Sequence, residues 1–193
     1  MKLLEEKILR DGRALNADVL LVDSFLNNQV DTDLMAEVGR TLAGAVKELG
    51  VTRVVTIESS GIAPAMMTAM ALNVPLVILK KSTSRILKDD VIQTEVFSFT
   101  KNAVYQLTLK KRFVLPGDKV LLVDDFLANG EAAQGASRLL EQAGASVAAI
   151  GIVIEKSFQP GRGILVDKGY RVISLARVKA MGEGHIEFAP ADA

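Results

Sequence analysis

The sequence contains no cysteine and only one histidine, His185. The missing thiols exclude disulfide scaffolds, thiolate zinc sites, iron–sulfur clusters and cysteine nucleophiles, and the single imidazole excludes a multi-histidine metal site. The chain also lacks an excess of either charge, because 23 Lys and Arg balance 23 Asp and Glu. Without a net positive field, non-specific binding to a nucleic acid is not expected.

Long apolar runs are absent as well, so no segment is predicted to cross a bilayer. Residues 1–13 mix charges of both signs in a helical pattern and do not form a signal peptide. A length of 193 residues suits one globular domain, and no repeat or linker divides the chain. We therefore expect a soluble, cytoplasmic, single-domain protein with no nucleic-acid or membrane partner.

The apolar pattern changes period along the chain in an order that indicates strands alternating with helices. The strand candidates are short and β-branched without polar alternation, which is typical of parallel strands buried on both faces. The sequence thus predicts an α/β fold, a mostly parallel sheet flanked by helices. Expected helices are residues 2–10, 31–49, 62–71 and 131–143; expected strands are residues 19–22, 53–57, 74–80, 119–124, 147–155 and 170–175.

Several segments need separate predictions. Residues 81–111 are polar and begin to alternate near Glu95, which predicts an antiparallel hairpin, and residues 81–101 are the candidate for a closing lid. Gly161-Arg162-Gly163 lacks the third glycine of a dinucleotide fingerprint and is assigned to a loop. Two smaller predictions concern single side chains: His185 faces solvent in a polar C-terminal tail, and Met66, Met67 and Met70 fill the core along a helix.

Residues 120–133, Val-Leu-Leu-Val-Asp-Asp-Phe-Leu-Ala-Asn-Gly-Glu-Ala-Ala, carry the clearest chemical signal. An apolar strand leads to two carboxylates, Asp124 and Asp125, and a small-residue turn then enters a helix. Ligands of open α/β sheets bind beyond the carboxyl ends of strands. Backbone N–H groups from Ala128 to Ala132, at the positive end of the helix, suit a phosphate, and the carboxylates suit sugar hydroxyls. A sugar phosphate satisfies both requirements.

A second strand–turn–helix segment covers residues 56–64 and contains Ser59, Ser60 and Gly61 in its bend. Hydroxyl and N–H groups at a helix N-terminus are anion ligands, although taken alone an ordinary capped helix is the better explanation. Lys80 and Lys81 end the following strand and would neutralise an anion there. A solvated surface pair is equally common.

Residues 120–133 resemble the phosphoribosyl pyrophosphate (PRPP) signature of type I phosphoribosyltransferases, with Asn129 where that family commonly has threonine. The chain as a whole resembles the bacterial xanthine phosphoribosyltransferases, most clearly at residues 22–27, 58–64, 124–130 and 154–162. The resemblance implies the type I phosphoribosyltransferase fold, with N- and C-terminal segments forming a base-binding hood. It also implies transfer of the 5-phosphoribosyl group from PRPP to N9 of xanthine, a pentosyl transfer of purine salvage that yields xanthosine 5′-monophosphate and pyrophosphate.

The same resemblance implies site residues and partners. Mg²⁺ is expected to arrive with PRPP rather than in a protein metal site, and family members are generally homodimers. Lys156 would favour an oxo or anionic base, whereas without the resemblance Lys156 is a surface charge and Phe158 a core residue. The implied residues are Asp124 and Asp125 for catalysis; Ala128, Asn129, Gly130, Glu131, Ala132, Ser59, Ser60, Gly61 and Lys81 for PRPP; and Leu20, Asn27, Lys156 and Phe158 for the base.

Two alternatives stay open. One is a phosphoribosyltransferase for guanine, hypoxanthine or adenine, although adenine gains little from Lys156 because its amino group is not an acceptor. The other is a PRPP-sensing transcriptional regulator of the same fold. Such regulators carry a DNA-binding domain, whereas here about thirty residues precede the first long helix and no net basic charge is present.

Overall fold

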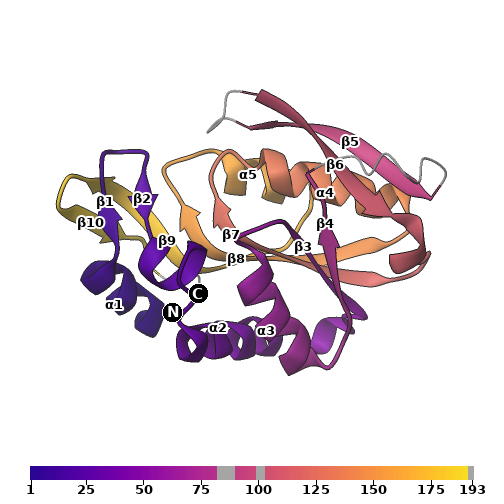
Figure 1. Ribbon diagram of the computed structural model, residues 1–193, viewed down its shortest axis with the longest axis horizontal. Helices are drawn as coiled ribbons and strands as arrows, with labels where there is room; N and C mark the ends of the chain where they lie inside the picture. The colour runs from indigo at the N-terminus through magenta and orange to yellow at the C-terminus, as the bar shows by residue number, and fades with distance from the viewer. Residues whose placement is uncertain (82–89, 99–102, 191–193) are drawn as a thin grey trace.

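A six-stranded sheet in the order β10-β9-β8-β7-β3-β4 forms the centre of the molecule (Figure 1). The computed structural model describes residues 1–81, 90–98 and 103–190. Neighbouring strands from β9 to β4 are parallel, and β10 is added antiparallel at the edge. The strands are β3 (Arg53–Ile57), β4 (Leu76–Leu79), β7 (Lys119–Leu127), β8 (Ser146–Lys156), β9 (Val172–Gly182) and β10 (His185–Phe188).

Helices cover both faces of this sheet, which confirms the predicted α/β class. The apolar spacing of α2 places its buried residues on one side, and the carboxylate of Asp31 caps the helix by accepting a hydrogen bond from the Leu34 N–H at 3.1 Å. Helices α1, α2 and α3 lie on one face, and α4 and α5 lie on the other. Their bounds are α1 (Lys2–Asp11), α2 (Thr32–Ala45), α3 (Ile62–Leu72), α4 (Glu131–Gln142) and α5 (Gly161–Asp167).

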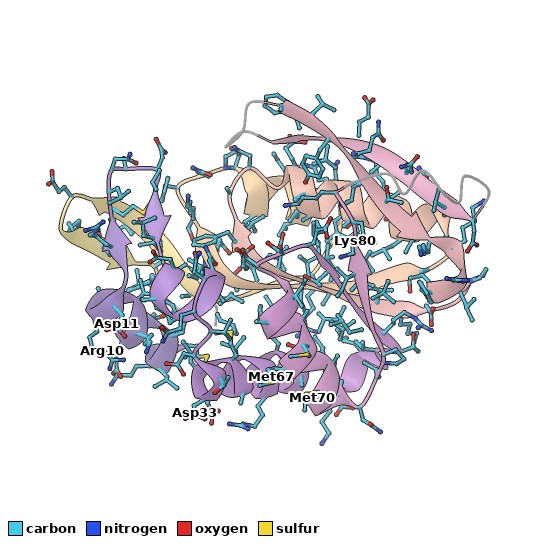
Figure 2. All side chains as sticks on the ribbon, viewed as in Figure 1. Arg10, Asp11, Asp33, Met67, Met70 and Lys80 are labelled. Carbon is cyan, nitrogen blue, oxygen red and sulfur yellow. The ribbon has the colours of Figure 1, made fainter. Side chains whose placement is uncertain are left out.

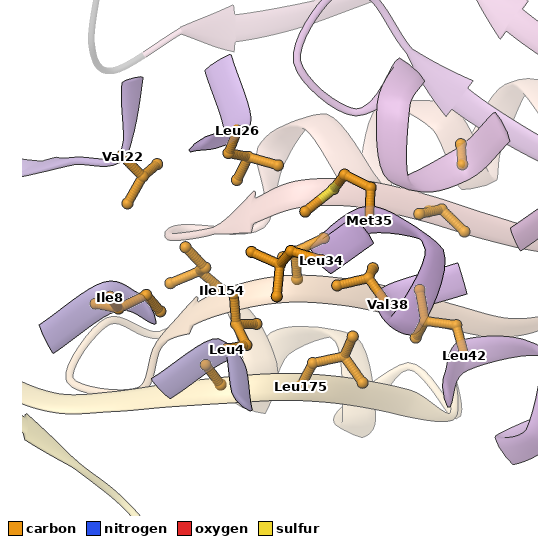
Figure 3. Packing of buried hydrophobic residues seen from close by; sticks show 14 of the residues in the cluster. Leu4, Ile8, Val22, Leu26, Leu34, Met35, Val38, Leu42, Ile154 and Leu175 are labelled. Atoms are coloured by element: carbon orange, nitrogen blue, oxygen red, sulfur yellow. The ribbon is translucent and has the colours of Figure 1, made fainter. Parts of the chain in front are cut away.

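Alternate residues of the central strands pack into two separate apolar clusters. Leu121 and Val123 of β7 face the cluster beneath α2 and α3, whereas Val120 and Leu122 face α4. Both faces of β7 are thus buried, which explains why its sequence shows no polar alternation. Burial of each such side chain contributes about 1.5–3 kcal/mol. Figure 3 shows part of the first cluster, in which α2 residues meet Ile154 and Leu175.

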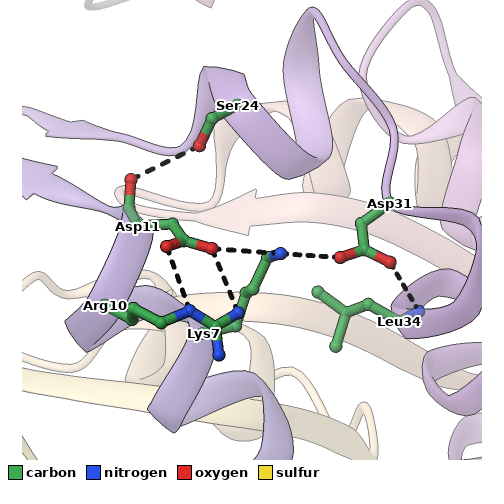
Figure 4. A network of polar contacts seen from close by, with 6 residues as sticks. All are labelled: Lys7, Arg10, Asp11, Ser24, Asp31 and Leu34. Atoms are coloured by element: carbon green, nitrogen blue, oxygen red, sulfur yellow. Dashed lines mark hydrogen bonds and ion pairs between the residues drawn. The ribbon is translucent and has the colours of Figure 1, made fainter.

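The N-terminal helix α1 packs against β9, so the two ends of the chain are joined in one cluster. Leu4 and Ile8 are fully buried there. On the outer side of α1, Lys7 Nζ lies 2.7 Å from Asp31 Oδ2 and 3.0 Å from Asp11 Oδ2 (Figure 4). The ion pair between Lys7 and Asp31 therefore links α1 to the N-terminal cap of α2.

Two antiparallel ribbons complete the fold. The N-terminal ribbon joins β1 (Arg13–Ala14) to β2 (Leu20–Leu21) and lies near β9 and β10 in Figure 1. The second ribbon joins β5 (Val91–Ser98) to β6 (Ala103–Lys110) and packs on α4. A Cβ at Gly135 of α4 would collide with Val96, so the glycine allows the close approach, and Arg138 Nη2 donates to the Glu95 carbonyl at 3.0 Å.

Several predictions about local structure are wrong. Residues 161–167 form helix α5 rather than a loop, and the hairpin begins at Val91 rather than near Glu95. The predicted polar tail contains the rest of β9 and the edge strand β10, where His185 is exposed. Met66 and Met70 of α3 do not fill the core, because they are 47% and 70% exposed (Met70 is labelled in Figure 2). No helix in the described part of the chain meets the length and hydrophobicity needed to span a membrane.

Candidate active site

A cavity of about 440 Å³ opens beyond the carboxyl ends of β3 and β7. Because these strands are parallel neighbours, the segments that follow them meet at one edge of the sheet. The hairpin β5–β6 closes a third side. The lining residues are Ile57, Glu58, Ser59, Ser60, Lys81, Phe97, Tyr105, Asp124, Asp125, Phe126, Leu127, Ala128, Asn129, Gly130, Glu131, Ala132 and Ala133.

The two predicted catalytic carboxylates lie at the base of this cavity, inside β7 rather than after it. Asp124 is only 9% exposed, and its Oδ1 accepts a hydrogen bond from the Asp125 N–H at 3.0 Å. Burial raises the pKa of Asp124 well above the usual aspartate range, and the negative charge of Asp125 raises it further. The positive charge of Lys81 acts in the opposite direction. A ligand that brings hydroxyl donors or positive charge would therefore favour the ionised form of Asp124.

The turn from Ala128 to Gly130 joins β7 to α4 and forms one wall of the cavity. Gly130 has φ +85°, a conformation that favours glycine. The N–H of Gly161 donates to the Ala128 carbonyl at 3.0 Å, so the start of α5 supports this turn from behind. The first turn of α4 lines the cavity as well, and N–H groups at that position lack partners within the helix. The arrangement suits a phosphate group.

The turn from Glu58 to Gly61 forms the opposite wall, and Ser59 and Ser60 line the cavity there. Gly61 lies behind the wall: a Cβ at this position would collide with Thr56 Oγ1 and would stand 3.0 Å from Asp124 Oδ1. Gly61 therefore lets the turn lie directly against the buried carboxyl. The peptide bond between Glu58 and Ser59 is cis.

The two adjacent lysines have different surroundings. Lys80 Nζ lies 2.8 Å from Glu58 Oε2, whereas Lys81 lines the cavity with its Nζ 5.5 Å from the centroid of the Tyr105 ring. Burial alone would raise the pKa of Glu58, but hydrogen bonds from Lys80 and from the Lys81 N–H lower it overall. Of the two lysines, Lys81 is thus the one that lines this cavity.

Three aromatic residues of the cavity were missed by the sequence reasoning: Phe97, Tyr105 and Phe126. Phe126 directly follows the two carboxylates, so its position in the motif could have indicated that it lines the same cavity. Phe97 and Tyr105 reach the cavity only because the hairpin packs on α4. Burial raises the pKa of Tyr105, and the negative charge of Asp124 raises it further, so the phenol stays protonated.

None of the four predicted base-binding residues is among those that line the cavity. Lys156 Nζ donates to the Asp18 carbonyl and lies over the ring of Phe126, a residue that lines the cavity, at 5.5 Å from the ring centroid. Burial lowers the pKa of Lys156, and the charge of Asp18 opposes this shift. Leu20, Asn27 and Phe158 do not line the cavity: Leu20 is buried in β2, Asn27 is exposed, and Phe158 is 40% exposed in the turn after β8. The interpretation of Phe158 as a core residue is wrong.

The predicted lid over residues 81–101 is described only in part. Within it, Val91–Ser98 form β5, a strand packed on α4. Residues 82–89 and 99–101 lie outside the described residues. The described part of the segment supplies one wall of the cavity through Phe97.

Solved structures with the same fold are phosphoribosyltransferases. An enzyme from Trypanosoma brucei, adenine phosphoribosyltransferase in complex with AMP, pyrophosphate and ribose-5-phosphate, superimposes with a TM-score of 0.76 at 18% identity, over 90% of this chain and 79% of that one. The APRTase of Giardia lamblia, complexed with 9-deazaadenine, gives a TM-score of 0.69 at 29% identity, over 76% of this chain and 81% of that one.

Sequence comparison extends this likeness over the full length. Xanthine phosphoribosyltransferase 1 of Clostridium botulinum strain Hall is 60% identical over 97% of this chain and 99% of its own. Xanthine phosphoribosyltransferase of Streptococcus gordonii is 53% identical over 100% of both chains. Residues 29–185 match the phosphoribosyl transferase domain. The chain therefore belongs to the phosphoribosyltransferase family, and within it to the xanthine phosphoribosyltransferases.

Proposed function

We propose that this protein transfers the 5-phosphoribosyl group from PRPP to N9 of xanthine in purine salvage. In this reaction the C1′–O bond to pyrophosphate breaks, a bond from N9 to C1′ forms, and the N9 proton is released. The products are xanthosine 5′-monophosphate and pyrophosphate. The observation that carries the proposal is one cavity in which a carboxylate pair lies between two turns of a kind that suits anions, in a chain 60% identical to a xanthine phosphoribosyltransferase.

The two turns suit the two phosphate ends of PRPP. The wall from Ala128 to Ala132, with Asn129, Gly130 and Glu131 between, takes the 5′-phosphate through backbone N–H groups. The opposite turn takes the pyrophosphate through Ser59, Ser60 and the backbone near Gly61, and Lys81 supplies a positive charge to the leaving group.

The carboxylates suit the ribose between these turns. Asp124 and Asp125 would accept hydrogen bonds from the ribose hydroxyls and hold negative charge near C1′, where positive charge develops in the transition state. Because Asp124 is buried, its charge is little screened by solvent. Neither residue needs to act as a nucleophile.

Mg²⁺ is the metal that we propose for this reaction, carried by the oxygens of PRPP. Mg²⁺ keeps several water or substrate ligands and seldom uses an all-protein cage. The donor set fits this behaviour, because Asp124 and Asp125 line the cavity with carboxylate oxygens, the ligand type that Mg²⁺ prefers, and PRPP and water would supply the other ligands. When bound, the ion would neutralise the leaving pyrophosphate. Asp124 and Asp125 are the residues placed to meet its ligand shell.

On the base side, Phe126 lines the cavity and Lys156 Nζ lies over its ring. An aromatic face stacks on a purine, and the ammonium group favours an oxo or anionic base. Leu20, Asn27 and Phe158 remain proposed base contacts on the hood side. Phe97 and Tyr105 of the hairpin limit the access of water, which would otherwise hydrolyse PRPP.

The decisive experiment measures nucleotide formation from PRPP and Mg²⁺ with xanthine, guanine, hypoxanthine and adenine in parallel. A kcat/KM for xanthine above those of the other three bases is expected. Equal values would overturn the assignment of the base while leaving the phosphoribosyl transfer intact. No product from any base, together with tight PRPP binding, would instead support a PRPP-sensing regulator.

We also propose that the protein forms a homodimer through the apolar face of α3 and the adjoining edge strand β4. Met66 and Met70 are exposed on α3, and they border a hollow of about 470 Å³ that reaches Leu76 of β4. Exposed apolar patches of this kind mark association sites. Light scattering of the wild type should give twice the chain mass, and a Met70→Glu substitution should shift it toward the monomer.

A further inference from the structure

A buried carboxylate, Glu155, lies outside the cavity but beside the strand that leads into the Ala128 turn. Glu155, near the end of β8, is 1% exposed and does not line the cavity. Its register partners are Leu127 of β7, which directly precedes the Ala128 turn, and Arg177 of β9. Glu155 is therefore next to the phosphate side in space and next to Lys156 in sequence.

Each oxygen of Glu155 is held by one arginine and one serine. Oε2 lies 2.9 Å from Arg162 Nη1 and accepts a hydrogen bond from the Ser174 hydroxyl. Oε1 lies 3.1 Å from Arg177 Nε and 2.7 Å from Ser157 Oγ. Burial alone would raise the pKa of Glu155, but these hydroxyls and guanidinium groups lower it overall. The carboxylate thus stays ionised and fully hydrogen-bonded.

One branch of this network leads to the phosphate side. Arg162 is the second residue of α5, and the residue before it, Gly161, donates its N–H to the Ala128 carbonyl at 3.0 Å. A Cβ on Gly161 would stand 2.8 Å from the Gly130 nitrogen. The Glu155–Arg162 pair therefore holds the start of α5 against the turn that we assign to the 5′-phosphate.

The other branch leads to the base side. Ser157 directly follows Lys156, its hydroxyl binds Glu155, and its N–H donates to the Val178 carbonyl at 2.8 Å. Lys156 in turn stands over the cavity-lining ring of Phe126. Fixing Ser157 thus fixes the direction in which the end of β8 presents Lys156.

We propose that Glu155 is a positioning residue that sets the separation between the phosphate turn and the base-side end of β8. It touches neither substrate, and it acts through Arg162 on one side and Ser157 on the other. Transfer between two bound molecules requires this separation, because a displacement of about 1 Å can cost about a hundredfold in rate. The role of Glu155 in turnover rests on the proposed function, whereas the mechanical coupling does not.

The test separates the two branches with single substitutions in the full-length protein. We expect Arg162→Ala to raise the KM for PRPP about tenfold with little change for xanthine, and Ser157→Ala to raise the KM for xanthine with little change for PRPP. Glu155→Gln should raise both and lower kcat. Glu187→Gln is the matched control, because its pair with Lys179 joins β9 to β10 on the surface and leaves both KM values unchanged.

Hydrogen exchange gives a second readout that needs no substrate. Arg162→Ala and Glu155→Gln should speed exchange of the backbone amides near Ala128 and Gly130, and Glu187→Gln should not. Variants that lower the melting temperature but keep wild-type KM values and exchange rates would reduce Glu155 to a purely structural residue. If the wild type converts no base, the function proposal fails, while the exchange result still decides the coupling.

Discussion

Gly161→Ala tests the contact between α5 and the phosphate turn more directly than any change at the turn itself. The new Cβ would collide with the Ala128 carbonyl oxygen and would stand 2.8 Å from the Gly130 nitrogen and 3.0 Å from the Asn129 carbonyl carbon. Ordinary contacts of a Cβ begin near 3.4 Å. Since all three neighbours are backbone atoms, no side chain can rotate away, and the turn must move away by roughly 1 Å to restore ordinary contact distances.

The expected magnitudes follow from this displacement. Overpacking of this kind costs about 1–3 kcal/mol of stability. In a domain of this size each kcal/mol lowers the melting temperature by about 2–4 °C. A shift of the phosphate turn should lower kcat/KM for PRPP by about tenfold to a hundredfold, because the ribose would no longer be aligned with the base.

Steady-state kinetics with PRPP as the varied substrate and thermal denaturation measure the two effects. Gly163→Ala, two residues further along the same helix, is the matched control, because its Cβ would meet nothing within 4 Å. It should be neutral or stabilise α5 by about 0.5–1 kcal/mol, since alanine favours a helix over glycine. Wild-type PRPP kinetics and an unshifted melting curve for Gly161→Ala would refute the reasoning.

Three further predictions concern the carboxylates and Lys156. Replacing both Asp124 and Asp125 by Asn should lower turnover about a hundredfold or more. The melting temperature should not fall, because burying the ionised form of Asp124 lowers stability as pH rises through its raised pKa. A folded variant with near-native turnover would remove both residues from the mechanism. In the pH profile of kcat/KM for PRPP, the raised pKa of Asp124 should place the acid limb above the usual aspartate range, and Asp125→Asn should shift that limb to lower pH. An unshifted limb would contradict the assignment of the limb to Asp124. Lys156→Ala should raise the KM for xanthine more than the KM for PRPP. The control Lys179→Ala should change neither KM value, and an unchanged KM for xanthine in Lys156→Ala would exclude Lys156 from base recognition.

The part of the cavity lining that we assign to the phosphate could be predicted to lie together, because its residues are local in the sequence. Residues 120–133 contain a strand, two carboxylates, a small-residue turn and a helix start in one continuous run, and Asp124 to Ala133 all line the cavity. The turn after β3 joins them because parallel neighbouring strands end at the same edge. Only the pairing of β3 with β7 could not be predicted from local sequence.

The base side and the hairpin wall could not be predicted in the same way. Phe97 and Tyr105 line the cavity because Gly135 lets the hairpin lie close on α4, a packing contact that no local pattern encodes. Lys156 reaches Phe126 because β8 pairs with β7. These neighbours are distant in sequence, so they follow from strand pairing and not from periodicity.

Some local predictions failed for identifiable physical reasons. Helix α5 contains two glycines and follows a proline, a composition typical of loops, and the Arg162–Glu155 pair and the Gly161–Ala128 hydrogen bond hold it in place. Met66 and Met70 lie on a helix that is apolar on all sides, so its sequence does not reveal which face meets the sheet.

The packing of α1 against β9 has a consequence for how the protein is assembled during synthesis. Leu4 and Ile8 emerge from the ribosome long before Leu175, which belongs to the same apolar cluster. Contacts between such distant residues slow folding, because a long loop must close before they form. Until β9 is made, the apolar face of α1 is covered only in part, and transiently exposed apolar surface of this kind favours aggregation and chaperone binding. Helix α1 is thus synthesised early, but its packing is completed only after β9 has been made.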